Sequence, residues 1–126
     1  MRETVLLINF QEPKQLREIK MILFTLKVRM KTVEKAEYLQ TVGFLAGVKE
    51  KEPEEKIYEG DDLGQEMMVF AGVPNNKLEQ ILFLIRKSGT KRVDYKAVLT
   101  ETNQEWTVLE LYEELAKEHE QMHKKQ

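Results

Sequence analysis

The sequence contains no cysteine and only two histidines. Without cysteine the chain can form no disulfide, no thiolate nucleophile and no cysteine metal site, which suits a reducing compartment. We therefore expect a cytoplasmic protein. Proline and glycine are also scarce, at 3 and 6 of 126 residues, and apolar residues make up 41%. This composition predicts a single folded domain over residues 1–126.

The chain also has no large excess of charge of one sign, and it has no long hydrophobic run. Lysine and arginine number 20 against 22 aspartates and glutamates, which gives a formal net charge of -2. A nearly neutral chain offers no global field for nucleic acid or an anionic membrane, so we expect neither partner. The N-terminal apolar run ends at Asn9, too early for a signal peptide or a membrane span.

Two β-α-β patterns are present in the chain. The apolar run 4–10 predicts a buried strand, and the helical spacing of Leu16, Ile19, Ile22 and Leu26 predicts a helix that begins at Pro13. The charged segment 28–35 is typical of an edge strand, on which lysine discourages further pairing.

The second half follows the same order. A strand is expected at 66–72, a helix from Pro74 to Gly89, and an edge strand at 92–100. A shift of roughly 62 positions superposes the two apolar strands, which predicts an internal repeat of about 4–47 and 66–120. Between them, 49–62 holds seven acidic and three basic residues and predicts a solvated connector.

These units predict a small α/β domain with a four-stranded sheet, in one of two topologies. If residues 36–47 form a helix that carries the chain back across the sheet, all strands run parallel in the order 2-1-3-4. If they do not, the third strand returns antiparallel, and the result is a ferredoxin-like α+β sandwich of order 4-1-3-2. We favour the parallel arrangement.

A parallel sheet of this order would have a ligand crevice beyond the carboxyl ends of its inner strands. Polar residues that follow the predicted strands could bind a small polar ligand there. The segment from Gly72 to Asn76 lacks both known phosphate-loop fingerprints, so a plain strand-to-helix turn explains it as well. The candidate ligand-binding residues are Asn9, Gln11, Gly72, Asn75, Asn76, Thr100, Thr102 and Asn103.

The string "HEQMH" places His119 and His123 four residues apart, as in the helical zinc motif of metalloproteases. A catalytic zinc ion needs a third ligand and a walled cavity, and the last turn of a terminal helix offers neither. We therefore expect a solvated tail, no metal site and no cofactor.

Basic residues gather near the two predicted edge strands. Protection of the strand edges explains them without a nucleic-acid partner, because only Tyr95 is interleaved as an aromatic platform. The residues are Arg29, Lys31 and Lys35 in the first half and Lys91, Arg92 and Lys96 in the second.

No nucleophile–base pair is available outside the tail, because the chain has no cysteine and both histidines lie in that tail. The carboxylates are scattered over surface-like positions, so none can be nominated as a catalytic pair. Enzymatic activity is therefore left open but disfavoured. We expect a non-enzymatic protein-binding or regulatory module; the alternative is a small-ligand-binding α/β domain, with enzymatic activity open, that uses the strand-end residues. The apolar stripe of the last helix extends to His119 and Met122, which suggests a homo-oligomer or another protein partner.

The segment "KAVLTETNQEW" ends in the only tryptophan. Thr107 and Glu110 have the spacing of a capping box, with Trp106 placed to pack on Leu111. Thr102 with Glu105 offers a rival box one turn earlier.

Together with "RMKTVEKAEYLQTVGFLAG", "YEG" and "LELYEELAKEHE", this segment resembles a family of small bacterial proteins described as domain of unknown function 3783. The resemblance extends over nearly the whole chain. It implies a bacterial, cytoplasmic protein, and it implies no activity, cofactor or catalytic residue.

Overall fold

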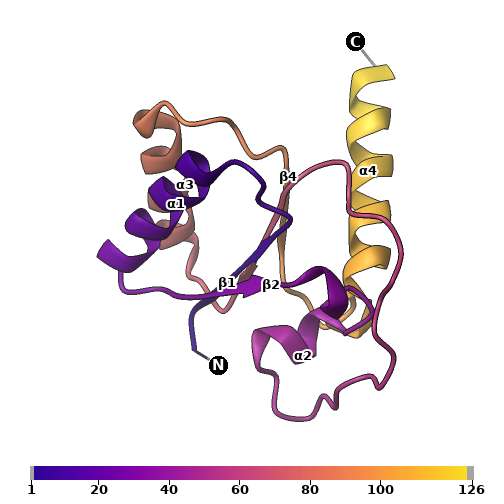
Figure 1. Cartoon of the computed structure of the whole chain (residues 1–126). Helices are drawn as coiled ribbons and strands as arrows, with labels where there is room; N and C mark the ends of the chain where they lie inside the picture. Colours follow the sequence, from indigo (N-terminus) through magenta and orange to yellow (C-terminus); the bar gives the residue numbers. More distant parts are fainter. Residues whose placement is uncertain (1, 125–126) are drawn as a thin grey trace.

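A computed structural model of the chain describes residues 2–124 as a four-stranded sheet with helices on both faces (Figure 1). Helices α1 and α3 lie side by side on one face, and α2 and α4 cover the other. The elements are β1 (Thr4–Ile8), α1 (Pro13–Thr25), β2 (Arg29–Val33), η1 (Lys35–Glu37), α2 (Val42–Ala46), β3 (Met67–Ala71), α3 (Asn75–Ser88), β4 (Tyr95–Val98), η2 (Asn103–Glu105) and α4 (Val108–Lys124).

The sheet confirms the α/β class and the strand order β2-β1-β3-β4. The expected directions are only partly right. Strands β1 and β2 pair in parallel, as do β3 and β4, but β1 and β3 pair antiparallel, with Thr4 opposite Ala71 and Ile8 opposite Met67. The all-parallel sheet is therefore wrong. The ferredoxin-like alternative predicted the direction of β3 correctly but placed the strands in the wrong order.

The antiparallel pairing arises because the chain crosses the sheet twice between β2 and β3. Helix α2 forms, as one alternative expected, and ends at Ala46, which lines the same hollow as Arg29 at the starting end of β2. The connector 47–66 then runs back, and Asn9 beyond the far end of β1 donates to the carbonyl of Leu63 at 2.8 Å. If β3 began directly after α2, it would run parallel to β1. Because the connector crosses the sheet a second time, β3 runs in the opposite direction.

Both inner strands are buried on two faces, which explains their continuous apolar sequences. Because side chains alternate along a strand, Val5 and Leu7 of β1 pack beneath α1 and α3, whereas Leu6 and Ile8 pack beneath α2 and α4. All residues of β1 and β3 are buried. The predicted central position of these strands is confirmed.

Two glycines end helices as the sequence predicted. Gly47 follows α2 with φ 90°, and Gly89 follows α3 with φ 76°. Both angles lie in the left-handed region, where a residue with a Cβ atom is strained, so glycine allows each helix to stop at that point.

The capping box of the last helix is also confirmed. The backbone N–H of Glu110 donates to Thr107 Oγ1 at 3.1 Å, and the backbone N–H of Thr107 donates to Glu110 Oε1 at 2.9 Å. Trp106 packs against the apolar cluster that contains Leu111. The rival box does not form, because the side chain of Thr102 makes no capping hydrogen bond.

The two helices on the α2/α4 face begin side by side. Thr41 caps α2 as Thr107 caps α4, and these two residues form an isolated antiparallel bridge. The sequence order of a strand, a helix, a strand, a 3-10 helix and a helix thus occurs twice, and the two occurrences are joined at equivalent caps. The bridging hydrogen bonds run from Val42 N to Trp106 O at 2.8 Å and from Val108 N to Gln40 O at 3.2 Å.

None of the helices within residues 2–124 has the length and apolarity needed to cross a membrane.

Substitution of Thr107 tests the importance of this junction. Thr107→Ala removes the cap of α4 and should lower the free energy of unfolding by about 0.5–2 kcal/mol. Thr102→Ala is the matched control and should change it by less than about 0.5 kcal/mol, since its side chain caps nothing. Urea unfolding followed by circular dichroism measures both; equal effects would contradict the assigned cap.

Candidate functional site

A hollow lies between helix α3 and the edge strand β4. Three residues connect α1 to β2, but six connect α3 to β4, so the second helix has a longer link to its strand. The hollow has a volume of about 390 Å³. Its lining combines apolar side chains from α3 with polar and basic side chains from the loop and strand: Leu82, Ile85, Arg86, Thr90, Arg92, Val93 and Lys96.

A second, smaller hollow of about 100 Å³ continues the first along β4, and the two share Leu82 and Lys96. Most of its lining is apolar, and Val98 leaves 49% of its surface exposed there. We call the two hollows together the basic groove. Besides the shared residues, the smaller hollow is lined by Phe70, Leu78, Ala97 and Val98.

Lys96 occupies the middle of the basic groove. It pairs in register with Met68, whose side chain lies in the α1/α3 core, so the Lys96 side chain projects to the same face as α3. Its Nζ donates to the carbonyl of Val93. Burial, followed by the nearby Arg92 guanidinium, lowers the pKa of Lys96, while Asp94 opposes that shift. The ammonium group is thus held in a partly dry, positively charged place.

Two arginines flank this lysine. Arg86 lies in the last turn of α3, and Arg92 lies in the loop before β4. Arg92 Nε is 3.0 Å from Asp94 Oδ1. Neither Arg86 nor Lys96 forms an ion pair with any described residue. The groove therefore holds more positive charge than its own carboxylate neutralises.

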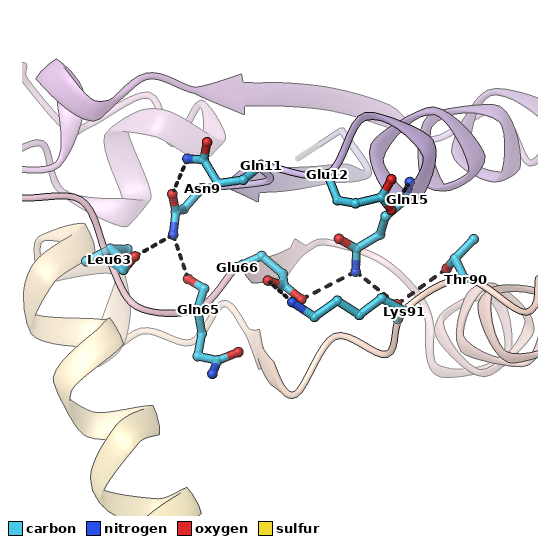
Figure 2. A network of polar contacts seen from close by, with 9 residues as sticks. All are labelled: Asn9, Gln11, Glu12, Gln15, Leu63, Gln65, Glu66, Thr90 and Lys91. Atoms are coloured by element: carbon cyan, nitrogen blue, oxygen red, sulfur yellow. Dashed lines mark hydrogen bonds and ion pairs between the residues drawn. The ribbon is translucent and has the colours of Figure 1, made fainter.

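A polar network fixes the loop that supplies this charge (Figure 2). Gln15 of α1 is 1% exposed, and its Nε2 donates to the carbonyl of Lys91 at 2.9 Å and to Glu66 Oε1 at 3.3 Å. The Nζ of Lys91 lies 3.5 Å from Glu66 Oε2. Because buried polar groups need partners, this amide and carboxylate tie the loop 89–94 to the first helix and to the start of β3.

The helix that carries Gln15 starts at a carboxylate cap. Glu12 Oε1 accepts from the backbone N–H of Lys14 at 3.0 Å, and its Oε2 accepts from that of Gln15 at 2.9 Å. Pro13 has no N–H and fits the first helical position. The start of α1, and with it the position of the buried amide, is therefore fixed locally.

The antiparallel pairing divides the predicted strand-end residues between opposite ends of the sheet. Asn9 and Gln11 lie where β1 ends, near the start of β3. Asn9 has φ 60°, and its Nδ2 donates to the carbonyls of Leu63 at 2.8 Å and Gln65 at 3.1 Å (Figure 2). Gln11 Nε2 donates to Asn9 Oδ1 at 2.7 Å. These amides hold the end of the connector.

The other predicted residues follow β3 and β4 at the opposite end. Gly72, with φ 68°, leads into α3, at whose first residues Asn75 and Asn76 lie. Thr100 and Asn103 bond one another: Asn103 Oδ1 accepts from Thr100 N at 2.8 Å, and Thr100 Oγ1 accepts from Asn103 N at 3.0 Å. Thr102 precedes η2 and is exposed. Thr100 and Asn103 thus satisfy backbone groups of their own loop.

His119 of the metalloprotease-like string lies beside Tyr95, with ring centroids 5.5 Å apart and ring planes tilted by 58°. The side chain of His123 lies outside the described residues. Among the described residues, no three histidine, cysteine, aspartate or glutamate side chains are grouped so that they could hold a metal ion.

The basic groove was missed as a site in the sequence. The sequence pattern placed Lys96 on an edge strand, where lysine only protects the strand edge. One signal in the sequence could have identified the groove. Three basic residues lie between the end of one predicted helix and the following strand: Arg86, Arg92 and Lys96. Consecutive elements of a β-α-β unit lie close in space, so these side chains could be expected to gather.

Comparison with known proteins gives one match. Residues 66–122 match the sequence model of a family described as Domain of unknown function (DUF3783), the family that the sequence resembles. The match spans β3 to α4 and contains the whole basic groove. No curated protein and no solved structure matches the chain.

Gln15→Leu tests the network that fixes the loop. The apolar side chain keeps the volume but leaves the carbonyl of Lys91 and part of Glu66 without a partner, so the free energy of unfolding should fall by about 1–3 kcal/mol. Amide hydrogen exchange in the loop 89–94 should accelerate. Gln80→Leu, at an exposed position of α3, is the control. Unchanged exchange in the loop would show that Gln15 does not hold it.

The lowered pKa of Lys96 gives a pH test with a defined sign. In the folded protein the charged form is disfavoured, so its cost to stability is full below the lowered folded pKa. The cost is released as the pH rises from there towards the ordinary value of 10.5. Wild type should therefore gain stability relative to Lys96→Met as the solution becomes alkaline. Urea midpoints of both proteins across pH measure this; a constant difference would refute it.

Proposed function

We propose that this protein is a non-enzymatic protein-binding module that holds an acidic, extended segment of a partner along the basic groove. The observation that carries the proposal is that Arg86 and Lys96 line an apolar hollow without forming an ion pair with any described residue. Arg86 is exposed and Lys96 is half-buried, so anionic groups of a partner can reach both cations. A segment with carboxylates and apolar side chains would satisfy both parts of the lining.

The shape of the groove supports an extended ligand. The two hollows follow one another along β4, which has a neighbouring strand on one side only. The other side presents backbone donors and acceptors to which a partner strand can add. Alternate side chains of such a strand would enter the groove between Arg86 and Val98, and this alternation would provide specificity.

The distribution of charge supports an acidic partner. From their sequences, α1 and α3 each carry a net charge of +2, with three basic residues and one acidic residue. In contrast, α4 carries five acidic and two basic residues, and the connector 49–62 carries seven and three. The net charge of the chain is close to zero, but the α1/α3 face is basic and the side with α4 and the connector is acidic. The field should guide an acidic segment to α3 and keep it away from α4.

The proposal retains a bacterial cytoplasmic setting, in agreement with the lack of cysteine and with the family resemblance. In this proposal the strand-end polar residues have a structural role only. The partner is a different protein and not a second copy of this chain.

A short synthetic peptide of alternating glutamate and valine is a direct probe. Fluorescence anisotropy should show binding that weakens as salt rises, because partly exposed charges are screened. The double variant Arg86→Ala, Lys96→Ala should lower the affinity at least about tenfold, the loss expected when charge-assisted hydrogen bonds of about 1.5–3 kcal/mol are removed. Arg17→Ala, an exposed position of α1, should leave it unchanged.

Three outcomes would overturn the proposal. Equal affinity of the peptide for the double variant and for wild type would place the peptide elsewhere on the molecule. Binding of citrate in the groove without binding of the peptide would favour the small-ligand alternative. A dimer in sedimentation that the peptide does not dissociate would favour a second copy of this chain as the occupant of the groove.

A further inference from the structure

We propose that Lys96 is a site of covalent acylation by acyl phosphates, and that the basic groove makes it more reactive than the other lysines. One hollow brings together a lysine, two guanidinium groups and an apolar wall. No part of this chemistry depends on the proposed protein partner.

The groove places complementary groups around the amine. Arg86 from α3 and Arg92 from the loop can hold the phosphate of the reagent, since guanidinium groups match phosphate oxygens. Leu82, Ile85 and Val93 provide an apolar surface for the acyl chain. Lys96 is the only lysine among the residues that line the groove.

The amine also has the environment that a nucleophile requires. A lysine attacks only in its neutral form, and desolvation or a neighbouring cation favours that form. Arg92 and Asp94, from the loop, are the charged groups that act on Lys96, and Arg86 of α3 lines the same hollow. Two are cations, and the one carboxylate is engaged by Arg92 at 3.0 Å. In support of the geometry, burial lowers the pKa of Lys96.

The reaction is a simple acyl transfer. The lone pair of Lys96 Nζ attacks the carbonyl carbon of the acyl phosphate, forming a C–N bond. The C–O bond to phosphate then breaks, and phosphate leaves with the electron pair. The amine gives up one proton to phosphate or water. The product is a neutral amide, so the groove loses one positive charge and part of its free volume.

This product would regulate the proposed function. An acidic segment would lose a charged partner and meet added bulk, so acylation of Lys96 should weaken its binding. This consequence, unlike the acylation itself, rests on the proposed function.

The test is a time course with acetyl phosphate, in which mass spectrometry measures the acetylation of each lysine. Lys87 is an internal control, because it follows Arg86 on the same helix but lies outside the groove, with its Nζ 5.9 Å from the Phe83 ring centroid. Lys96 should react several-fold faster than Lys87 in the folded protein, and the two rates should become equal in urea. Equal rates in the folded protein would overturn the proposal.

Variants test the role of the arginines. Arg86→Gln and Arg92→Gln should each remove most of the advantage of Lys96 over Lys87, while Arg17→Gln should not; thermal melts confirm that each variant is folded. An advantage that survives both groove variants would overturn the assigned site. Selective acetylation that leaves peptide affinity unchanged would overturn the regulatory consequence alone, and a failure of the unmodified protein to bind peptide would overturn the proposed function alone.

Discussion

The antiparallel pairing of β1 with β3 determines the rest of the structure. It sets two strand-helix-strand halves head to tail, so that each inner strand is buried on both faces and each edge strand lies at one side of the sheet. It also separates the ends of β1 and β3, so no shared crevice can form beyond them. The connector 47–66 makes this pairing possible, because the chain must cross the sheet again before β3 can begin. Hydrogen bonds from Asn9 hold the end of the connector.

Within this arrangement the two halves differ at one place that matters for function. A longer link joins the helix of the second half to its strand, and Gln15 and Glu66 hold that link against the first half. The groove thus depends on contacts between halves, although all of its lining comes from the second. The family match over residues 66–122 covers that lining but leaves out the amide of Gln15.

Much of the fold could be predicted, because its strands and caps are encoded locally. Continuous apolar sequence identifies β1 and β3 as central strands, and the spacing of Thr107 and Glu110 identifies a helix start. Strand direction could not be predicted this way, since an apolar strand has the same sequence pattern in either direction. The environment of Lys96 was equally hidden: whether an edge-strand lysine faces solvent or a groove depends on how the preceding helix, α3, and the loop 89–94 pack against that strand.

The charge of the molecule is nearly balanced in total but separated in space, with the groove on the basic side and α4 and the connector carrying the acidic excess. We propose that this groove is a binding surface for acidic segments. The most direct test is an NMR titration of isotope-labelled protein with the glutamate-valine peptide. Binding in the groove predicts saturable shifts of the backbone amides in β4 and in the loop 89–94; shifts confined to α4 or the connector, or no shifts at all, would contradict it.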